Sequence, residues 1–193
     1  EEPTEEPTEE PTDEPTDEPT GEPGASDSKR FTDLGNHKWA EEAIYRLVAA
    51  GVVNGTSDTT YSPGANITRA DFTTLIVRAF KFEADIATFA DVDSSKYYAA
   101  PIGIAKTLGI VNGVTETNFV PTSQITRQDM MVIIYRALGV AGIKVEKAQS
   151  PTFSDANAVA SYAKEAVEAL TGAGIIAGSN GKINPKANTT RAE

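Results

Sequence analysis

Three short motifs carry the residues of this chain that are best suited to bind a ligand. They occupy 67–71, 125–129 and 189–193, and each places an arginine between a threonine and an acidic residue. Thr followed three residues later by Asp or Glu is a capping-box pattern, which predicts that a helix begins at each motif. The arginine then lies in the first turn and faces the positive end of the helix dipole, which is unfavourable by roughly 0.3–1 kcal/mol. Three arginines at this position therefore indicate a function beyond helix formation.

The repeated arginines Arg69, Arg127 and Arg191 support two interpretations. A guanidinium fork beside free amides at a helix start is suited to hold an anion. Alternatively, each arginine pairs on its buried side with an aspartate that recurs near the start of each repeating segment. Those aspartates are Asp33, Asp91 and Asp155. The motifs alone leave both interpretations open.

The elements that must position these arginines also recur. Each segment opens with Phe-x-Asp, continues with an aromatic residue before Ala and then a Gly before two apolar residues, and reaches a Pro shortly before the Thr-Arg motif. The phenylalanines are Phe31, Phe89 and Phe153; the aromatic residues are Trp39, Tyr98 and Tyr162; the glycines are Gly51, Gly109 and Gly174. Apolar residues at helical spacing follow the aromatic residue and, in the first two segments, the Thr-Arg motif. Glycine fits a left-handed helix end, so the pattern predicts helix, structured loop and second helix.

A repeat of this size cannot bury its own apolar face, so the three segments should pack on one another. We expect a mostly α fold of three helix-loop-helix repeats with a pseudo-threefold arrangement. The expected boundaries are a tail at 1–28 and repeats at 29–86, 87–150 and 151–193. The chain begins inside a tail repeat and stops at the third motif, so we expect both ends to be cuts. Because the third repeat lacks its second helix, we also expect apolar core residues to be exposed.

The acidic net charge of −11 belongs to the first part of the chain. Of the 28 acids, residues 1–24 hold 11 and no base, which leaves 17 acids against 17 bases in the rest. A neutral body lacks the basic patch of a nucleic-acid-binding protein. The tail repeats Glu/Asp-Glu-Pro-Thr with nothing apolar to bury, which predicts a disordered, extended tether.

Other classes of site are excluded by residue type. The chain has no cysteine, so disulfides, thiolate metal sites and cysteine nucleophiles are excluded. No apolar run approaches the ~18 residues of a membrane span. The single histidine, His37, has no evident nucleophile or metal partner. We therefore expect neither an enzyme nor a cofactor or metal site.

The repeated motifs resemble those of the S-layer homology family. That family's unit runs Phe-x-Asp, an aromatic-Ala helix start, Gly-Ile-x-x-Gly, a loop ending in Phe-x-Pro, and then Ile-Thr-Arg-Ala-Glu before a second helix. The resemblance covers 31–193. It implies a pseudo-trimer with a central helical bundle that attaches its protein non-covalently to the secondary polysaccharide of the cell wall. The implied ligand is a pyruvylated amino sugar, held in grooves between the units.

The resemblance also assigns roles to residues. By position, Arg69, Arg127 and Arg191 are the binding arginines, and a guanidinium fork suits the carboxylate of a pyruvate ketal. The three aromatic residues, Trp39, Tyr98 and Tyr162, cover a sugar face or anchor the helix starts in the core. Gly55, Gly113 and Gly178 let backbone amides approach the ligand or serve a turn. The third unit has Thr189 in place of Ile, which favours the sites at Arg69 and Arg127 over Arg191.

The resemblance further implies a secreted protein at the cell wall or S-layer surface of a Gram-positive bacterium. Its partner would be secondary cell-wall polysaccharide attached to peptidoglycan, with no nucleic acid and no membrane insertion. A cargo domain is expected N-terminal to the linker. The competing hypothesis is a protein–protein module that assembles a surface lattice without recognising sugar.

Overall fold

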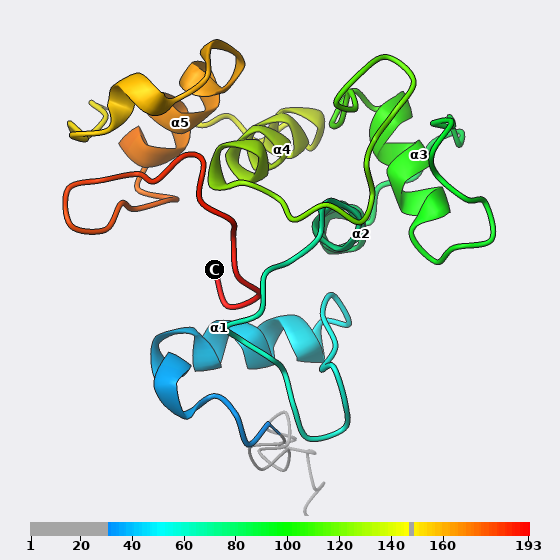
Figure 1. Cartoon of the computed structure of the whole chain (residues 1–193), viewed down its shortest axis with the longest axis horizontal. Coiled ribbons are helices and arrows are strands. Elements are labelled where there is room, and N and C mark those ends of the chain that lie inside the picture. The colour runs from blue at the N-terminus through cyan, green and yellow to red at the C-terminus, as the bar shows by residue number, and fades with distance from the viewer. Residues whose placement is uncertain (1–30, 147–148) are drawn as a thin grey trace, which may run out of the picture. The chain divides into compact units, whose positions relative to one another are not determined.

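A computed structural model describes residues 31–146 and 149–193. The predicted disordered tail, 1–28, lies outside these residues. The described part contains five α-helices and three short 3-10 helices (Figure 1). The α-helices are α1 (Lys38–Ala49), α2 (Arg69–Phe80), α3 (Ala99–Thr107), α4 (Arg127–Val140) and α5 (Lys164–Gly172); the 3-10 helices are η1 (Gly35–His37), η2 (Ala156–Ala158) and η3 (Ser161–Ala163). The prediction of a mostly helical fold is confirmed. None of these helices is long and apolar enough to cross a membrane.

Threonine caps begin two of the helices where the Thr-Arg motifs predict them. The Thr68 hydroxyl accepts the amide of Asp71 at 3.0 Å at the start of α2, and Thr126 accepts that of Asp129 at 3.3 Å at the start of α4. In both caps the hydroxyl also donates to the aspartate carboxylate. In the third motif the longer Glu193 reaches back to accept the backbone amide of Thr190 at 2.9 Å, as in a full capping box.

A glycine with left-handed backbone follows the first helix of each repeat, two residues after its last residue. The φ angles of Gly51, Gly109 and Gly174 are +69°, +70° and +69°. Glycine adopts this conformation without the steric cost of a Cβ atom. The apolar pair that follows the glycine returns to the core in the first two repeats, where Val53, Ile110 and their neighbours are buried. In the third repeat the same prediction is wrong for Ile175, which is 52 % exposed, while Ile176 packs partly buried against the core.

The three repeats are joined by a closed cycle of backbone hydrogen bonds. The amide of Ile67 donates to Thr189 O at 3.0 Å, that of Ile125 to Ile67 O at 3.1 Å, and that of Thr189 to Ile125 O at 3.0 Å. Each repeat therefore donates to one neighbour and accepts from the other. All three side chains are buried, so this cycle forms the centre of a pseudo-threefold arrangement.

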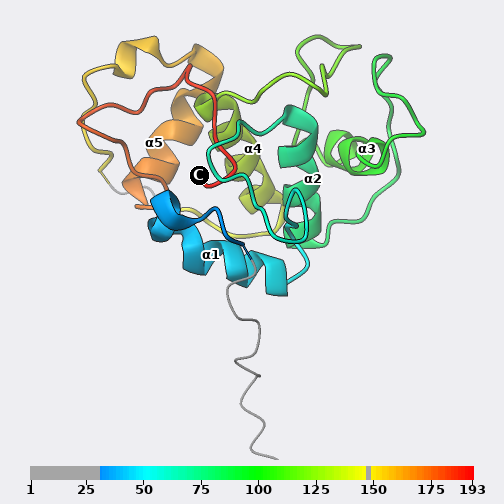
Figure 2. The same ribbon diagram turned by 60° about the horizontal axis from the view of Figure 1, so that its bottom comes forward.

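The helices pack as α2 against α3, α4 against α5, and α2 against α4, which Figures 1 and 2 show from two sides. Their apolar faces share one core that includes Phe119, Met131 and Leu170. Helix α1 forms a smaller cluster of its own. Leu47 of α1 is 40 % exposed, whereas Leu170, which also precedes its helix-ending glycine by four residues, is fully buried.

Candidate ligand site between the repeats

Each motif arginine is bound to the loop of the next repeat. The Nε–H of Arg69 donates to Phe119 O at 3.0 Å and that of Arg127 to Ile183 O at 3.0 Å. The Nε–H of Arg191 closes the cycle by donating to Tyr61 O at 2.9 Å. The guanidinium carbon of Arg69 lies 4.8 Å from the centre of the Phe119 ring, and that of Arg191 lies 4.7 Å from the Tyr61 ring. The arginines thus hold the repeats together as well as facing the grooves between them.

The amides at the helix starts are occupied, so the prediction of free amides beside the arginines is wrong. At α2 the amide of Arg69 donates to Ser123 O at 2.8 Å and that of Ala70 donates to Pro121 O at 3.0 Å. The next amide, of Asp71, is bound by the threonine cap. The helix start therefore binds the neighbouring repeat, and the guanidinium is left as the group that can hold an anion.

The recurring aspartates bind backbone amides of their own repeat. Asp91 accepts the amides of Phe119 at 2.8 Å and Val120 at 2.7 Å. The same two bonds recur in the other repeats: Asp33 accepts from Tyr61 and Ser62, and Asp155 from Ile183 and Asn184. The arginines instead form ion pairs with Asp129 and Glu193. The hypothesis that each arginine pairs with a recurring aspartate is therefore wrong for Arg69 and Arg127.

These aspartate bonds hold an unusual turn in place. Ser62, Val120 and Asn184 each precede a proline and have φ of +57°, +57° and +53°. A positive φ is costly for a β-branched residue such as valine, and a residue before proline normally avoids it. The turn orients the preceding carbonyl, which is the acceptor for the arginine. Aspartate, turn and arginine therefore form one connected unit.

The aspartates themselves show the effect of these bonds. Burial acts to raise the pKa of Asp33, but the amides of Tyr61 and Ser62 outweigh it and the pKa is lowered. In the third repeat, burial likewise acts to raise the pKa of Asp155, and the amides of Ile183 and Asn184 lower it overall. Amide donors favour the charged carboxylate. Both side chains are thus held as anions at neutral pH.

Arg69 faces a cavity of about 440 Å³ built from all three repeats. The first repeat contributes Arg69, the second contributes the loop around Gly113 and one face of α4, and the third contributes Tyr162. Asp129 lies 3.6 Å from Arg69 Nη1 and accepts the Tyr162 hydroxyl at 2.7 Å. The structure thus brings together three of the predicted site residues that lie 44 to 93 positions apart.

Arg127 faces a second cavity, of about 730 Å³, with the corresponding residues of the other repeats. Gly178 of the third repeat and Trp39 of the first repeat line it. Glu193 forms the ion pair with Arg127 Nη1, and Arg127 Nη2 donates to Ala177 O at 3.4 Å. This guanidinium is more fully engaged by the protein than that of Arg69.

Arg191 lies at the contact between the third repeat and the first. Its Nη2 donates to Asn54 O at 2.9 Å, and Asn54 precedes the predicted site residue Gly55. For Arg69, by contrast, the only further polar contact of the guanidinium within 31–146 and 149–193 is the 3.6 Å ion pair with Asp129. The terminal nitrogens of Arg69 therefore make fewer hydrogen bonds to the protein than those of Arg127 or Arg191.

The aromatic residue of the second repeat that corresponds to Trp39 and Tyr162 is one position earlier than predicted. Trp39, Tyr97 and Tyr162 each precede the helix-ending glycine by twelve residues. The hydroxyl of Tyr97 donates to Asp71 as that of Tyr162 donates to Asp129. Tyr98 is partly buried and packs against the main core. Tyr97, and not Tyr98, therefore corresponds to Trp39 and Tyr162, and counting back from the glycine would have found it.

The three aromatic residues are surface groups and not core anchors of the helix starts. Trp39 is 67 % exposed, Tyr97 63 % and Tyr162 57 %. Burial and the hydrogen bond to its aspartate raise the pKa of Tyr162 to about 12, and the same causes raise that of Tyr97 to about 12. Both phenols are therefore neutral donors at physiological pH. Burial lowers the pKa of Arg69, while Asp129 acts to raise it. The guanidinium of an arginine nevertheless stays charged at neutral pH.

The recurring glycines at Gly55, Gly113 and Gly178 are required by packing. An added Cβ atom would lie 2.4 Å from the Phe31 ring at Gly55 and 2.4 Å from the Phe153 ring at Gly178. At Gly113 it would lie 2.5 Å from Thr115 O, and this residue also has a φ of +78°. The turn interpretation therefore explains these glycines, although two of them also line the cavities.

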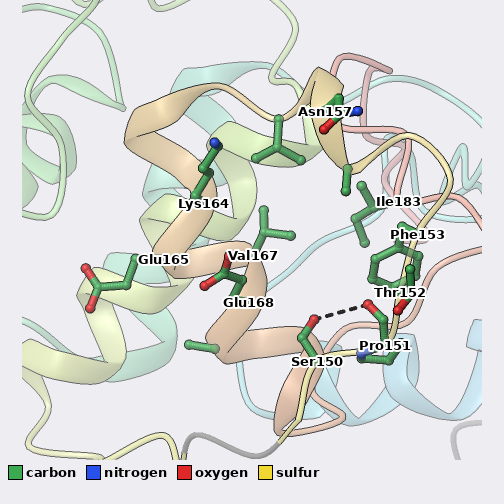
Figure 3. Close-up of a pocket in the computed structure, with 13 residues that line it drawn as sticks. Ser150, Pro151, Thr152, Phe153, Asn157, Lys164, Glu165, Val167, Glu168 and Ile183 are labelled. Atoms are coloured by element: carbon green, nitrogen blue, oxygen red, sulfur yellow. Dashed lines mark hydrogen bonds between the residues drawn. The ribbon is translucent and has the colours of Figure 1, made fainter.

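A further cavity lies within the third repeat and contains none of the predicted site residues. It has a volume of about 470 Å³ and lies between α5 and 150–153 (Figure 3). Helix α5 has Glu168 where α3 has Gly103, six residues before the helix-ending glycine. A Cβ atom at Gly103 would lie 2.5 Å from Ala87 O, so only the glycine allows the preceding segment to pack closely. In α5 the side chain at the equivalent position, Glu168, lines the cavity.

Comparison with known families agrees with the threefold repetition. The model of the S-layer homology domain matches residues 30–73, 88–131 and 152–193. The chain belongs to the S-layer homology family. Its first 29 residues match a second model, the PT disordered repeat. S-layer homology domains are non-catalytic anchoring modules of the bacterial cell surface, and this chain has three of them.

The relatives of this S-layer homology chain include enzymes and surface-layer proteins. It is 36 % identical to an amylopullulanase of Thermoanaerobacterium thermosulfurigenes over 86 % of the chain and 9 % of that protein. It is 34 % identical to the surface-layer 125 kDa protein of Lysinibacillus sphaericus over 80 % of the chain and 13 % of that protein. It is 30 % identical to S-layer protein EA1 of Bacillus anthracis over 88 % of the chain and 20 % of that protein. The chain thus spans a fifth or less of these relatives.

Proposed function

We propose that this chain anchors its protein to the cell wall by binding an anionic sugar of the secondary polysaccharide. The observation that carries the proposal is the position of Arg69 in the cavity shared by three repeats. Its Nε–H is fixed by Phe119 O, and its terminal nitrogens face a space that Tyr162 also lines. A fixed, planar guanidinium in a half-enclosed space is suited to bind a carboxylate with two parallel hydrogen bonds.

The chemistry fits a pyruvylated amino sugar. A pyruvate ketal presents one carboxylate on a rigid ring, which the Arg69 fork would bind while the exposed face of Tyr162 covers the sugar. Asp129 already holds both the fork and the phenol in place. Because these groups are positioned before the ligand arrives, little conformational entropy is lost on binding. The second groove offers Arg127 and Trp39 in the same roles.

The grooves should differ in strength. Arg69 keeps more of its donors for a ligand, whereas Arg127 is engaged by Glu193 and Ala177 and Arg191 is engaged by Asn54. We therefore expect the Arg69 groove to bind most tightly. In this proposal the tail tethers a cargo domain that lies N-terminal to it, and the protein resides at the wall of a Gram-positive bacterium.

The test is a pull-down of the full chain with purified Gram-positive cell-wall sacculi, before and after acid removal of the secondary polysaccharide. Two variants probe the grooves without cutting the arginine bonds between repeats. Tyr162→Ala removes the aromatic face beside Arg69, and Trp39→Ala removes the one beside Arg127. Leu47→Ala is the matched control, since Leu47 is another exposed apolar side chain of α1.

The proposal predicts that binding is lost on stripped walls, weakened several-fold in Tyr162→Ala and Trp39→Ala, and unchanged in Leu47→Ala. Circular dichroism establishes that each variant is folded. Equal binding to stripped and intact walls would overturn the proposal. That result would favour a protein–protein module that assembles a surface lattice without recognising sugar.

A further inference from the structure

We propose that the Arg69 groove continues along α4 to a second cationic position, so that one glycan segment with two acidic groups is bound. The second position consists of Arg136 and Lys144. This inference rests on the proposed function and adds the class of ligand: an anionic chain segment, and not a single acidic sugar.

One face of α4 forms a wall of the Arg69 cavity. The residues of this face are Asp129, Val132, Ile133 and Arg136. They follow the i, i+3, i+4, i+7 spacing of a helical stripe. Asp129 contacts Arg69 at one end, and Arg136 lies seven residues further on, roughly 10 Å along the helix axis. Arg69 and Arg136 therefore line the same cavity beside different turns of α4.

Arg136 also lines another cavity, of about 550 Å³, at the C-terminal end of α4. Lys144 lines this cavity as well, and its side chain is exposed. The residues that line the two cavities include three bases, Arg69, Arg136 and Lys144, and one acid, Asp129. Positive charge therefore extends beyond the arginine of the motif, and an anionic polymer would be attracted along this line.

The structural bond of Arg136 leaves most of its donors free for such a ligand. Its Nη1 donates to Ile110 O at 3.4 Å, which is long for a hydrogen bond. No other hydrogen bond or ion pair of this guanidinium is present in the described part of the chain. An arginine has five N–H donors. Arg136 is thus held loosely beside the groove and can turn toward an acidic group.

The experiment compares two probes by isothermal titration with the full chain. One is the methyl glycoside of a pyruvylated N-acetylhexosamine, which has a single carboxylate. The other is a synthetic oligosaccharide that carries the same terminal sugar and a second pyruvate ketal two sugars away. The variants are Arg136→Gln and Lys144→Gln. Arg46→Gln, which removes an exposed cation from α1, is the matched charge control.

The wild type should bind the two-ketal oligosaccharide about tenfold more tightly than the monosaccharide, as expected for one added charge-assisted contact. Arg136→Gln and Lys144→Gln should each reduce this preference, and Lys144→Gln, which lies outside the Arg69 cavity, should leave the affinity for the monosaccharide unchanged. Arg46→Gln should retain the preference. Lys144→Gln keeps the test valid if Arg136→Gln disturbs folding, because the Lys144 side chain is exposed.

Two results would overturn the inference alone: equal wild-type affinities for both probes, or a preference that persists in both variants. A wild type that binds neither probe would overturn the proposed function, and this inference with it. The two failures are therefore distinguishable.

Discussion

The Nε–H of Arg69 donates to the carbonyl oxygen of Phe119 at 3.0 Å, and Phe119 lies fifty residues away in the next repeat. The residue best placed to bind a ligand is thus also a structural link between repeats. Its outer nitrogens face the groove while its inner nitrogen closes the interface. This double role explains why an arginine is required in a helical turn where its charge is unfavourable.

Replacement of Arg69 by alanine should reduce stability. The variant leaves Phe119 O without its donor, and both residues are buried. An unsatisfied buried carbonyl costs about 1–3 kcal/mol, so the free energy of unfolding in urea should fall by that amount. Arg46→Ala, at an exposed position of α1, should change it by less than about 0.5 kcal/mol. A stable Arg69→Ala variant would show that the Nε bond contributes little.

Replacement of Val120 by asparagine should stabilise the protein. Val120 has a φ of +57°, and Asn184 occupies the equivalent position with a φ of +53°. The left-handed conformation costs a branched residue about 1–2 kcal/mol, and asparagine tolerates it better. Val120→Asn should therefore raise the free energy of unfolding by about 1 kcal/mol. The reciprocal variant Asn184→Val should lower it by a similar amount, and equal stabilities would contradict the strain.

Two glycine variants should separate backbone strain from steric clash. Gly51→Ala places a Cβ atom in open space at a φ of +69°, so it should cost only about 1 kcal/mol. Gly113→Ala has a similar φ but its Cβ atom would lie 2.5 Å from Thr115 O. Overpacking adds about 1–3 kcal/mol. Thermal unfolding should therefore rank Gly113→Ala as the less stable variant, and the opposite order would be inconsistent with the turn.

The hydrogen bonds of Asp33 and Asp155 predict that stability falls at acidic pH. The pKa of Asp33 and of Asp155 is lowered in the folded state from the ordinary value of 3.8. A lowered pKa contributes stability that is complete above the unfolded value and is lost as the pH falls through the folded one. The stability difference between wild type and the Asp33→Asn, Asp155→Asn double variant should shrink below about pH 4. A difference that is constant down to acid pH would contradict this assignment.

Much of the fold follows from local sequence. The Thr-Arg motifs predict the starts of α2 and α4 because Thr68 and Thr126 cap them. Gly109 and its counterparts predict where the first helices end, because a left-handed residue favours glycine. Repetition predicts that the repeats pack together. These features depend on residues close in the chain, and one sequence is enough to see them.

The site could be predicted only in part. Repetition of residue types marks Arg69, Gly113 and Tyr162 as candidate site residues, yet their meeting in one cavity depends on cyclic pairing of each repeat with the next. The roles of the recurring aspartates were not visible, because Asp91 binds amides 28 and 29 residues away in a loop without regular structure. The sequence pattern selects Tyr98 instead of Tyr97, because Tyr98 is directly followed by an alanine, as are Trp39 and Tyr162.

The most direct test of the central claim is the affinity of the full chain for wall polysaccharide with its pyruvate ketals intact and after their selective removal. The guanidinium of Arg69 would make charge-assisted hydrogen bonds to the ketal carboxylate, each contributing about 1.5–3 kcal/mol. Loss of one such bond corresponds to about 10- to 100-fold, so we predict that removal of the ketals weakens binding by at least that factor. Equal affinity for the two polymers would contradict anion recognition in the grooves.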